Sequence, residues 1–184
     1  KDVIASAKSL TTRHDLAIGI GAAVKDVLFQ SGIEPSEISM ASLSTTLATN
    51  ALVEGQGERV GLVYIGFRKG DLERHGLGDA LRDDPVLEMS GGHSHAGYEV
   101  TPFDDAKLYD WLSELSGVAA YAVAAQFATR NPAHEKYAAD LIREWTSRPV
   151  SASHQLSTKL NGPKRALTAI LNARLIGMID RLIG

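Results

Sequence analysis

The segment VAAYAVAAQF, residues 118–127, is the most apolar stretch of the chain. It is far shorter than the roughly 20 residues that cross a bilayer. A short and nearly unbroken apolar run is typical of a strand whose two faces are both covered by other elements. We therefore expect it to be a buried strand in a parallel sheet of an α/β protein.

Upstream of this run, short apolar segments alternate with helical patterns. Thr12 followed by Asp15 resembles a capping box, and Gly32 stands where a helix would end, so a helix is predicted between them. A second helix is predicted over 45–54, where Gly55 and Gly57 follow. Strands are predicted over 3–9, 38–44 and 59–67.

Downstream, the pattern continues in the same alternation. Residues 68–102 predict irregular structure with a hairpin around Glu88 and Glu99. Helices are predicted from Asp104 or Asp105 to Ser116, from Pro132 to Ser147 and from Gly162 onward, with a strand over 150–155. The residues expected on buried helix faces are Ala138, Leu141, Ile142 and Trp145, then Leu167, Ile170, Leu171, Leu175, Met178, Ile179 and Leu182.

Composition narrows the class of protein. The chain has 184 residues, of which 44% are hydrophobic and 22% charged, so it can bury the core of one globular domain. Its net charge of -3, with scattered basic residues, gives no reason to expect nucleic acid or a membrane as partner. It lacks cysteine, which excludes disulfides and thiolate chemistry and suits a reducing, cytoplasmic setting. We expect one soluble α/β domain with a mainly parallel or mixed central sheet flanked by helices.

The first candidate site is the hydroxyl-rich segment before the predicted helix over 45–54. If Ser44 or Thr45 caps that helix, the free amides of its first turn are suited to bind a phosphate or an oxyanion. Thr46 and Thr49 add hydroxyl donors, and Asn50 follows one turn into the helix. Serine and threonine are also preferred caps in helices without any function, so both interpretations stay open.

The second candidate is SGGHSHAGYE, residues 90–99. His93 and His95 are two residues apart, so on an extended segment they face the same side and could bind a metal, with Glu99 or Asp84 as further ligands. A glycine-rich surface turn explains the same letters without any ligand. The histidines are therefore weak metal candidates.

Two further candidates follow the buried strand. Asn131, His134 and Glu135 stand at the predicted strand-to-helix junction, where parallel sheets bind ligands, although Asn-Pro also simply starts helices. Arg165, Thr168 and Asn172 form a polar line on the last helix. Such an asparagine is more often an interhelical hydrogen-bonding residue than a substrate contact. No catalytic nucleophile or general base is identified.

Four ordered motifs together resemble the hydantoinase/oxoprolinase family. STTLATNALVEGQGERVGLVYIGF, residues 44–67, is similar to that family's Thr-Thr and Ala-Thr-Asn-Ala-Leu signature, which leads into a strand ending at Gly-Phe. FATRNPAHE, residues 127–135, resembles its Phe-x-x-x-Asn-Pro-x-His-Glu stretch. PVSASHQL, residues 149–156, and RALTAILNA, residues 165–173, resemble its Val-Ser-x-Ser strand and its Arg-x-x-Thr-x-x-x-Asn-Ala helix.

The resemblance implies an actin-like ATPase domain of the ribonuclease-H-like type. Residues 1–184 would be the N-terminal domain of a longer A-type subunit, truncated at both ends and lacking the first, phosphate-binding hairpin. That subunit would use ATP and a divalent cation such as Mg²⁺ to open a cyclic amide, as an oligomer with a B-type subunit or region. Thr45, Thr46, Thr49 and Asn50 would contact phosphate or substrate, with Asn131, His134 and Glu135 as a second cluster.

Other functions remain open at this stage. Ser44 replaces the usual glycine of the family, and GGHSHAG is richer in histidine than the family pattern. The same motifs suit a non-catalytic binding or assembly module, or an acetone-carboxylase-like subunit. A metal-dependent amide hydrolase centred on His93 and His95 is a further alternative.

Overall fold

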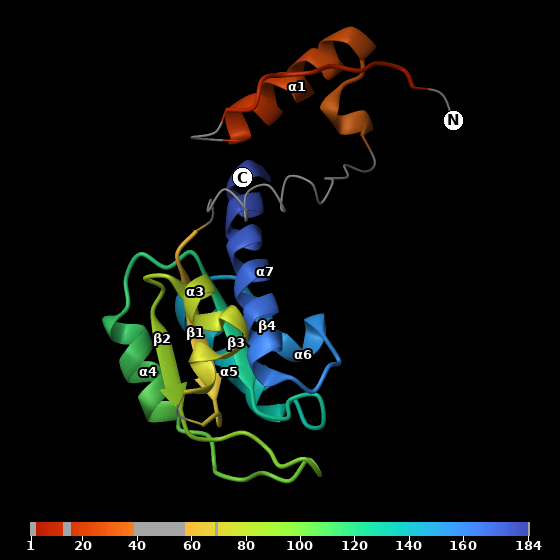
Figure 1. The fold of residues 1–184 in the computed structure, drawn as a ribbon. Coiled ribbons are helices and arrows are strands. Elements are labelled where there is room, and N and C mark those ends of the chain that lie inside the picture. Colours follow the sequence, from red (N-terminus) through yellow and green to blue (C-terminus); the bar gives the residue numbers. More distant parts are fainter. Residues whose placement is uncertain (1–2, 13–15, 39–57, 69, 184) are drawn as a thin grey trace. The chain divides into compact units, whose positions relative to one another are not determined.

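The computed structural model describes residues 3–12, 16–38, 58–68 and 70–183 (Figure 1). The chain divides into two compact units. One comprises Lys1–Asn50 with Arg181–Gly184, and the other Ala51–Asp180. The predicted strand over 38–44 and helix over 45–54 lie almost wholly outside the described residues.

The first unit contains helix α1 (Leu16–Ser31) and the 3-10 helix η1 (Pro35–Glu37). The predicted helix is confirmed. Gly32, at φ +67°, ends it by donating its N–H to the carbonyl of Leu28 at 2.9 Å. Thr12 accepts the Gly19 N–H at 3.0 Å, which satisfies one free donor near the start of the helix. The strand predicted over 3–9 is wrong, because no described strand pairs with this segment.

The second unit is built on a four-stranded sheet. Its strands are β1 (Val60–Ile65), β2 (Val86–Met89), β3 (Ala120–Ala125) and β4 (Val150–Ala152). All three pairings are parallel, in the order β2-β1-β3-β4. The α/β class and the strand predicted within 118–127 are both confirmed, and that strand lies inside the sheet.

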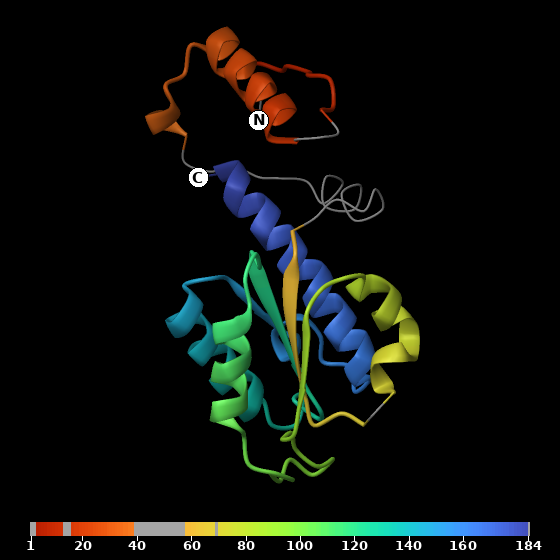
Figure 2. The ribbon, with the colours of Figure 1, turned by 90° about the vertical axis from the view of Figure 1, so that its left-hand side faces the viewer.

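Helices cover both faces of the sheet (Figure 2). On one face lie α4 (Asp105–Glu114) and α5 (Ala133–Thr146). The other face is covered by α3 (Leu77–Leu81) and α7 (Gly162–Ile183). The 3-10 helix η2 (Asp71–Gly76) precedes α3, and α6 (Ser153–Leu156) directly follows β4. The described parts of the chain include no helix with the length and hydropathy needed to cross a bilayer.

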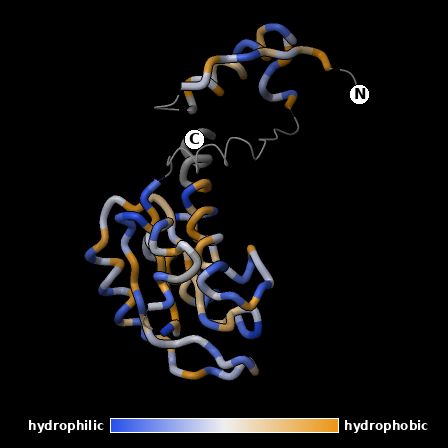
Figure 3. Tube along the Cα trace, in the orientation of Figure 1, coloured by the Kyte–Doolittle hydropathy of each residue, from blue (hydrophilic) through white to orange (hydrophobic). Residues whose placement is uncertain are grey.

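The pleat of β1 divides the core into two clusters. Val63 and Ile65 face α4 and α5, whereas Leu62 and Tyr64 face α3 and α7. Figure 3 shows hydrophobic residues along the strands. The buried face of α7 consists mainly of Ala166, Ala169, Ile170 and Ala173, so small side chains let this helix lie close to the sheet. The larger Leu167, Leu171 and Leu175 of the predicted face are only partly buried.

Three details of the prediction are wrong. Val86–Met89 is not an arm of a hairpin but pairs in parallel with β1; the antiparallel bridge joins His93 and Glu99. Trp145 is 57% exposed, because it lies in the last turn of α5 with its ring against Tyr109 of α4, 5.1 Å away. The strand predicted over 150–155 stops at Ala152, where α6 begins.

The N-cap of α4 gives the first testable prediction. Asp104 accepts the Lys107 N–H at 3.0 Å and so satisfies a free donor of the first turn. Asp104→Ala is expected to lower the free energy of unfolding by about 1 kcal/mol, as cap removal usually does. Urea unfolding followed by circular dichroism checks this, with the exposed Asp110→Ala of the same helix as control. Equal stability of the two variants would contradict the capping role.

Candidate functional site

The order of the strands places a topological switch point between β1 and β3. From β1 the chain passes to β2 on one side and then to β3 on the other. Open α/β sheets bind ligands outside the carboxyl ends of the strands at such a point. Here the two strands lead into Gly66 and Gln126, and the Gln126 N–H donates to the carbonyl of Ile65 at 2.9 Å.

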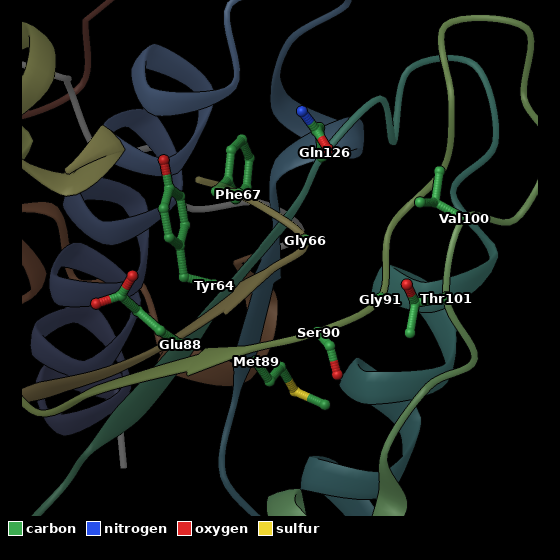
Figure 4. A pocket seen from close by; sticks show the side chains of 10 residues that line it. All are labelled: Tyr64, Gly66, Phe67, Glu88, Met89, Ser90, Gly91, Val100, Thr101 and Gln126. Atoms are coloured by element: carbon green, nitrogen blue, oxygen red, sulfur yellow. The ribbon is translucent and has the colours of Figure 1, made fainter. Parts of the chain in front are cut away.

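Two adjoining hollows lie at this point, and together we call them the crevice. They share Phe67 and Gln126, and their volumes are about 350 and 230 Å³. The first, shown in Figure 4, is lined by Tyr64, Gly66, Phe67, Glu88, Met89, Ser90, Gly91, Val100, Thr101 and Gln126. The second is lined by Phe67, Asp71, Gln126, Phe127, Leu160, Asn161, Gly162 and Pro163.

The described lining of the crevice combines aromatic rings with amide, hydroxyl and carboxylate groups. The ring of Phe67 stacks on that of Tyr64, with centroids 3.8 Å apart and planes 9° from parallel. The Gln126 amide and the hydroxyls of Ser90, Thr101 and Tyr64 supply donors and acceptors (Figure 4). No lysine or arginine is among the described lining residues, which include the acids Glu88 and Asp71. This part of the site suits an uncharged ligand better than a free anion.

Backbone conformations that favour glycine gather at the crevice. Gly66 has φ +75°, and a Cβ atom there would overlap the carbonyl of Gly91. Phe127, which is not glycine, has φ +54°. Such conformations cost about 1–3 kcal/mol and are concentrated at binding sites. The close fit of Gly66 against Gly91 sets the shape of the crevice.

The segment Ser90–Gly92, which we call the glycine loop, forms one wall of the crevice. Gly92 accepts the Val100 N–H at 3.1 Å, and the next residue, His93, donates its N–H to the carbonyl of Gln126 at 3.2 Å. Gly92 also donates its own N–H to Nδ1 of His134 at 2.9 Å. The loop is thus held through Gly92 from two sides.

The predicted cluster of Asn131, His134 and Glu135 lies at the start of α5, but its members point to different places. Asn131 donates to the carbonyl of Gly97 and accepts the Ala133 N–H, both at 3.0 Å. His134 binds the glycine loop on one side and Glu99 on the other, at 2.7 Å. Asn131 and His134 line a separate hollow of about 430 Å³ together with His93, Glu99, Phe103, Ala133 and Tyr137.

Glu135 lies inside the domain and is 0% exposed. One carboxylate oxygen accepts the Ala125 N–H at 2.7 Å and the Ser153 hydroxyl at 2.5 Å. The other accepts the backbone N–H of His154 at 2.8 Å and lies 2.6 Å from its Nδ1. Glu135 therefore joins the end of β3 to the start of α6, which directly follows β4.

The polar line of α7 extends this buried network. Arg165 donates to the carbonyl of Ala125 at 2.9 Å and to Ser153 at 3.3 Å, and burial lowers its pKa while Glu135 acts in the opposite direction. Asn172 donates to the Ser151 hydroxyl of β4 at 2.9 Å, so it bonds a strand and not a second helix as expected. Thr168 only bonds the carbonyl of Lys164 on its own helix.

The four predicted metal ligands do not come together: His93 and Glu99 pair across the hairpin of residues 93–99, but His95 and Asp84 lie elsewhere. His93 is buried beside His134, with ring centroids 4.5 Å apart, whereas His95 lies 6.5 Å from the ring of Phe127. Asp84 stands before β2, at the opposite edge of the sheet, where it pairs with Arg174. Burial lowers the pKa of the His93 imidazole, and the neighbouring His134 lowers it further. The described residues contain no group of three potential metal ligands.

The remaining predicted residues, Thr45, Thr46, Thr49 and Asn50, lie outside the described residues. In turn, sequence patterns missed Gln126 and Phe67 as parts of a site, and they marked Ser90–Gly92 only as part of the candidate segment 90–99. The only signal was indirect, since Gln126 and Phe127 end the apolar run that opens at residue 118. These residues are recognised as the lining of the crevice only once the order of the strands is known, and the sequence alone does not give that order.

Comparison with known families now identifies the class of protein. The chain belongs to the hydantoinase/oxoprolinase family, because the model of the hydantoinase/oxoprolinase N-terminal region matches residues 1–146.

Among curated relatives, it is 29% identical to the acetophenone carboxylase gamma subunit of Aromatoleum aromaticum, over 97% of this chain and 29% of that protein. It is 28% identical to caprolactamase subunit alpha of Pseudomonas jessenii, over 96% of this chain and 28% of that protein. With 5-oxoprolinase 1 of Arabidopsis thaliana it shares 30% identity, over 83% of this chain and 15% of that protein. The chain thus spans less than a third of the length of these relatives.

Solved structures show the same fold. The crystal structure of ATP-dependent caprolactamase from Pseudomonas jessenii matches with a TM-score of 0.66 at 27% identity, over 96% of this chain and 29% of that one. A nucleotide-free structure of acetone carboxylase matches with a TM-score of 0.59 at 19% identity, over 96% of this chain and 31% of that one. The second match supports the fold alone.

Proposed function

We propose that this chain is part of an ATP-dependent enzyme subunit that opens an uncharged cyclic amide, and that the crevice binds the amide ring. The observation that carries the proposal is the lining of the crevice, which has an amide, hydroxyls and aromatic rings but no cationic side chain in its described part. A cyclic amide presents one N–H and one carbonyl, which match the acceptor and the donor of the Gln126 side chain. The apolar carbons of the amide ring would pack against the aromatic ring of Phe67.

Family membership and named relatives support the use of ATP. One solved relative is an ATP-dependent caprolactamase, and another curated relative is a 5-oxoprolinase. ATP would supply a phosphoryl group for the amide oxygen, which turns a poor electrophile into one that water can open. The chain would contribute by holding and orienting the ring.

We assign the phosphate contacts to Thr45, Thr46, Thr49 and Asn50, as a proposal from the motif alone. The described residues offer no cationic lining at the crevice that would do this instead. Nor do they offer a set of three metal ligands, so we give the divalent cation no residue. A partner subunit of the B type would complete the enzyme.

The Gln126 side chain provides the test. In the full-length protein assembled with its partner, Gln126→Leu is expected to raise the KM for an uncharged lactam about 10- to 100-fold, the effect of losing about 1.5–3 kcal/mol of paired hydrogen bonding. The KM for ATP should stay within about twofold of the wild-type value, because the lactam ring, and not the nucleotide, would contact Gln126. Steady-state kinetics with ε-caprolactam measures both constants.

A matched control is Gln155→Leu, on the exposed surface of α6. It should leave both constants unchanged. If Gln126→Leu leaves the lactam KM unchanged, the ring does not bind in the crevice. If the wild-type enzyme opens no lactam with ATP present, the proposed activity itself is wrong.

A second candidate function is activation of a ketone for carboxylation. The similarity to the acetophenone carboxylase gamma subunit, which extends over 97% of this chain, favours it. An aromatic ketone would also suit the stacked rings of Tyr64 and Phe67. Bicarbonate-dependent ATP hydrolysis with a ketone, and none with a lactam, would select this function.

A further inference from the structure

We propose that His134 is a positioning residue whose neutral imidazole fixes the glycine loop at the wall of the crevice. It does so without contacting the ligand. The assignment rests on the proposed function only for the statement that the crevice holds a substrate. The contact between His134 and the loop can be tested without it.

The hydrogen bonds of His134 define its tautomer. Nδ1 accepts the N–H of Gly92 at 2.9 Å in a buried setting, so the ring hydrogen is carried by Nε2. Nε2 in turn donates to a carboxylate oxygen of Glu99 at 2.7 Å. Glu99 therefore selects the tautomer that leaves Nδ1 free to accept from the loop.

Because its glycines have no side chains, the glycine loop is held through its backbone, and His134 adds a side-chain contact to the bonds that Gly92 and His93 make with Val100 and Gln126. Gly91 and Gly92 have φ angles of +132° and +79°, which side chains would disfavour. A Cβ atom on Gly91 would come within 3.2 Å of His134 Nδ1, so the ring lies directly against the loop. The opposite side of Gly91 faces Gly66 in the crevice. A shift of His134 would therefore move the wall against which the ligand binds.

Protonation would reverse the contact. An imidazolium carries a hydrogen on Nδ1, which would then face the N–H of Gly92, donor against donor. The contact with Gly92 therefore requires the neutral ring. The titratable groups that face the ring are His93 and Glu99 of the hairpin and Tyr137 of α5, whose hydroxyl bonds Asp105.

Two substitutions separate positioning from simple packing. In His134→Asn, the side-chain oxygen takes the place of Nδ1 and can accept from Gly92 while the Glu99 contact is lost. In His134→Gln, the amide reaches the place of Nε2, and the Gly92 contact is lost. We expect the KM for the lactam in the full-length assembled enzyme to stay within about threefold for Asn and to rise about 10-fold or more for Gln, the effect of one buried hydrogen bond.

Backbone hydrogen exchange at Gly92 gives a readout that needs no activity. The Gln variant should exchange faster than wild type, and the Asn variant should keep most of its protection. Equal KM increases in both variants, or unchanged exchange at Gly92 in the Gln variant, would overturn the proposal. An inactive wild type with the expected exchange pattern would refute the proposed function and leave the role of His134 standing.

Discussion

Glu135→Ala is expected to lower the free energy of unfolding by about 3–5 kcal/mol, because it removes the acceptor of a fully buried polar network. The Ala125 N–H, the Ser153 hydroxyl and the backbone N–H of His154 would all lose their partner. The Arg165 guanidinium, which is 1% exposed, would lose the carboxylate whose charge counters its burial. Urea unfolding followed by circular dichroism measures the change.

Glu135→Gln keeps the shape of the side chain and one of its oxygens. Its amide group would face the N–H of His154, donor against donor, so we expect a smaller loss of about 1–3 kcal/mol. Glu144→Ala, on the exposed face of the same helix, is the control and should change stability by less than about 0.5 kcal/mol. A Glu135→Ala variant as stable as this control would show that the network does not hold the strands together.

Gly66→Ala is the second substitution with a large expected effect. Its φ of +75° alone costs an L-residue about 1–2 kcal/mol. The new Cβ would also overlap the carbonyl of Gly91, and forcing the backbone apart adds about 1–3 kcal/mol. Because that displacement moves the glycine loop, we expect both a lower melting temperature and weaker lactam binding.

Gly70→Ala separates the two causes. Gly70 has a similar φ of +86°, but an added Cβ there meets nothing within 4 Å. It should therefore show the conformational cost without the clash and leave lactam binding unchanged. Equal melting temperatures for the two variants would mean that the contact between Gly66 and Gly91 is not tight.

The sequence predicts the parts of the fold that depend on local pattern. The apolar run 118–127 contains β3, Gly32 ends α1, and Asp104 caps α4, because each signal is physically local. The strand predicted over 3–9 fails for the converse reason. Alternation makes a strand only where a neighbour completes the hydrogen bonds, and no described strand does so here.

The site was less predictable because it depends on strand order. Asn131, His134 and Glu135 lie close together in the sequence, yet their side chains bond to different parts of the fold. These are the hairpin of residues 93–99, the glycine loop and a buried network, respectively. Their residue types indicated a polar junction but not the direction of each side chain. Gln126 carries no signal of its own, and it becomes a candidate only once β1 and β3 are known to be neighbours.

The most direct test of the proposed function is a crystal structure of the full-length subunit with an uncharged lactam bound. We predict that the ring lies in the crevice, with its amide within hydrogen-bond distance of the Gln126 side chain and its carbons against Phe67. Lactam bound elsewhere, with the crevice empty at saturating concentration, would contradict the proposal.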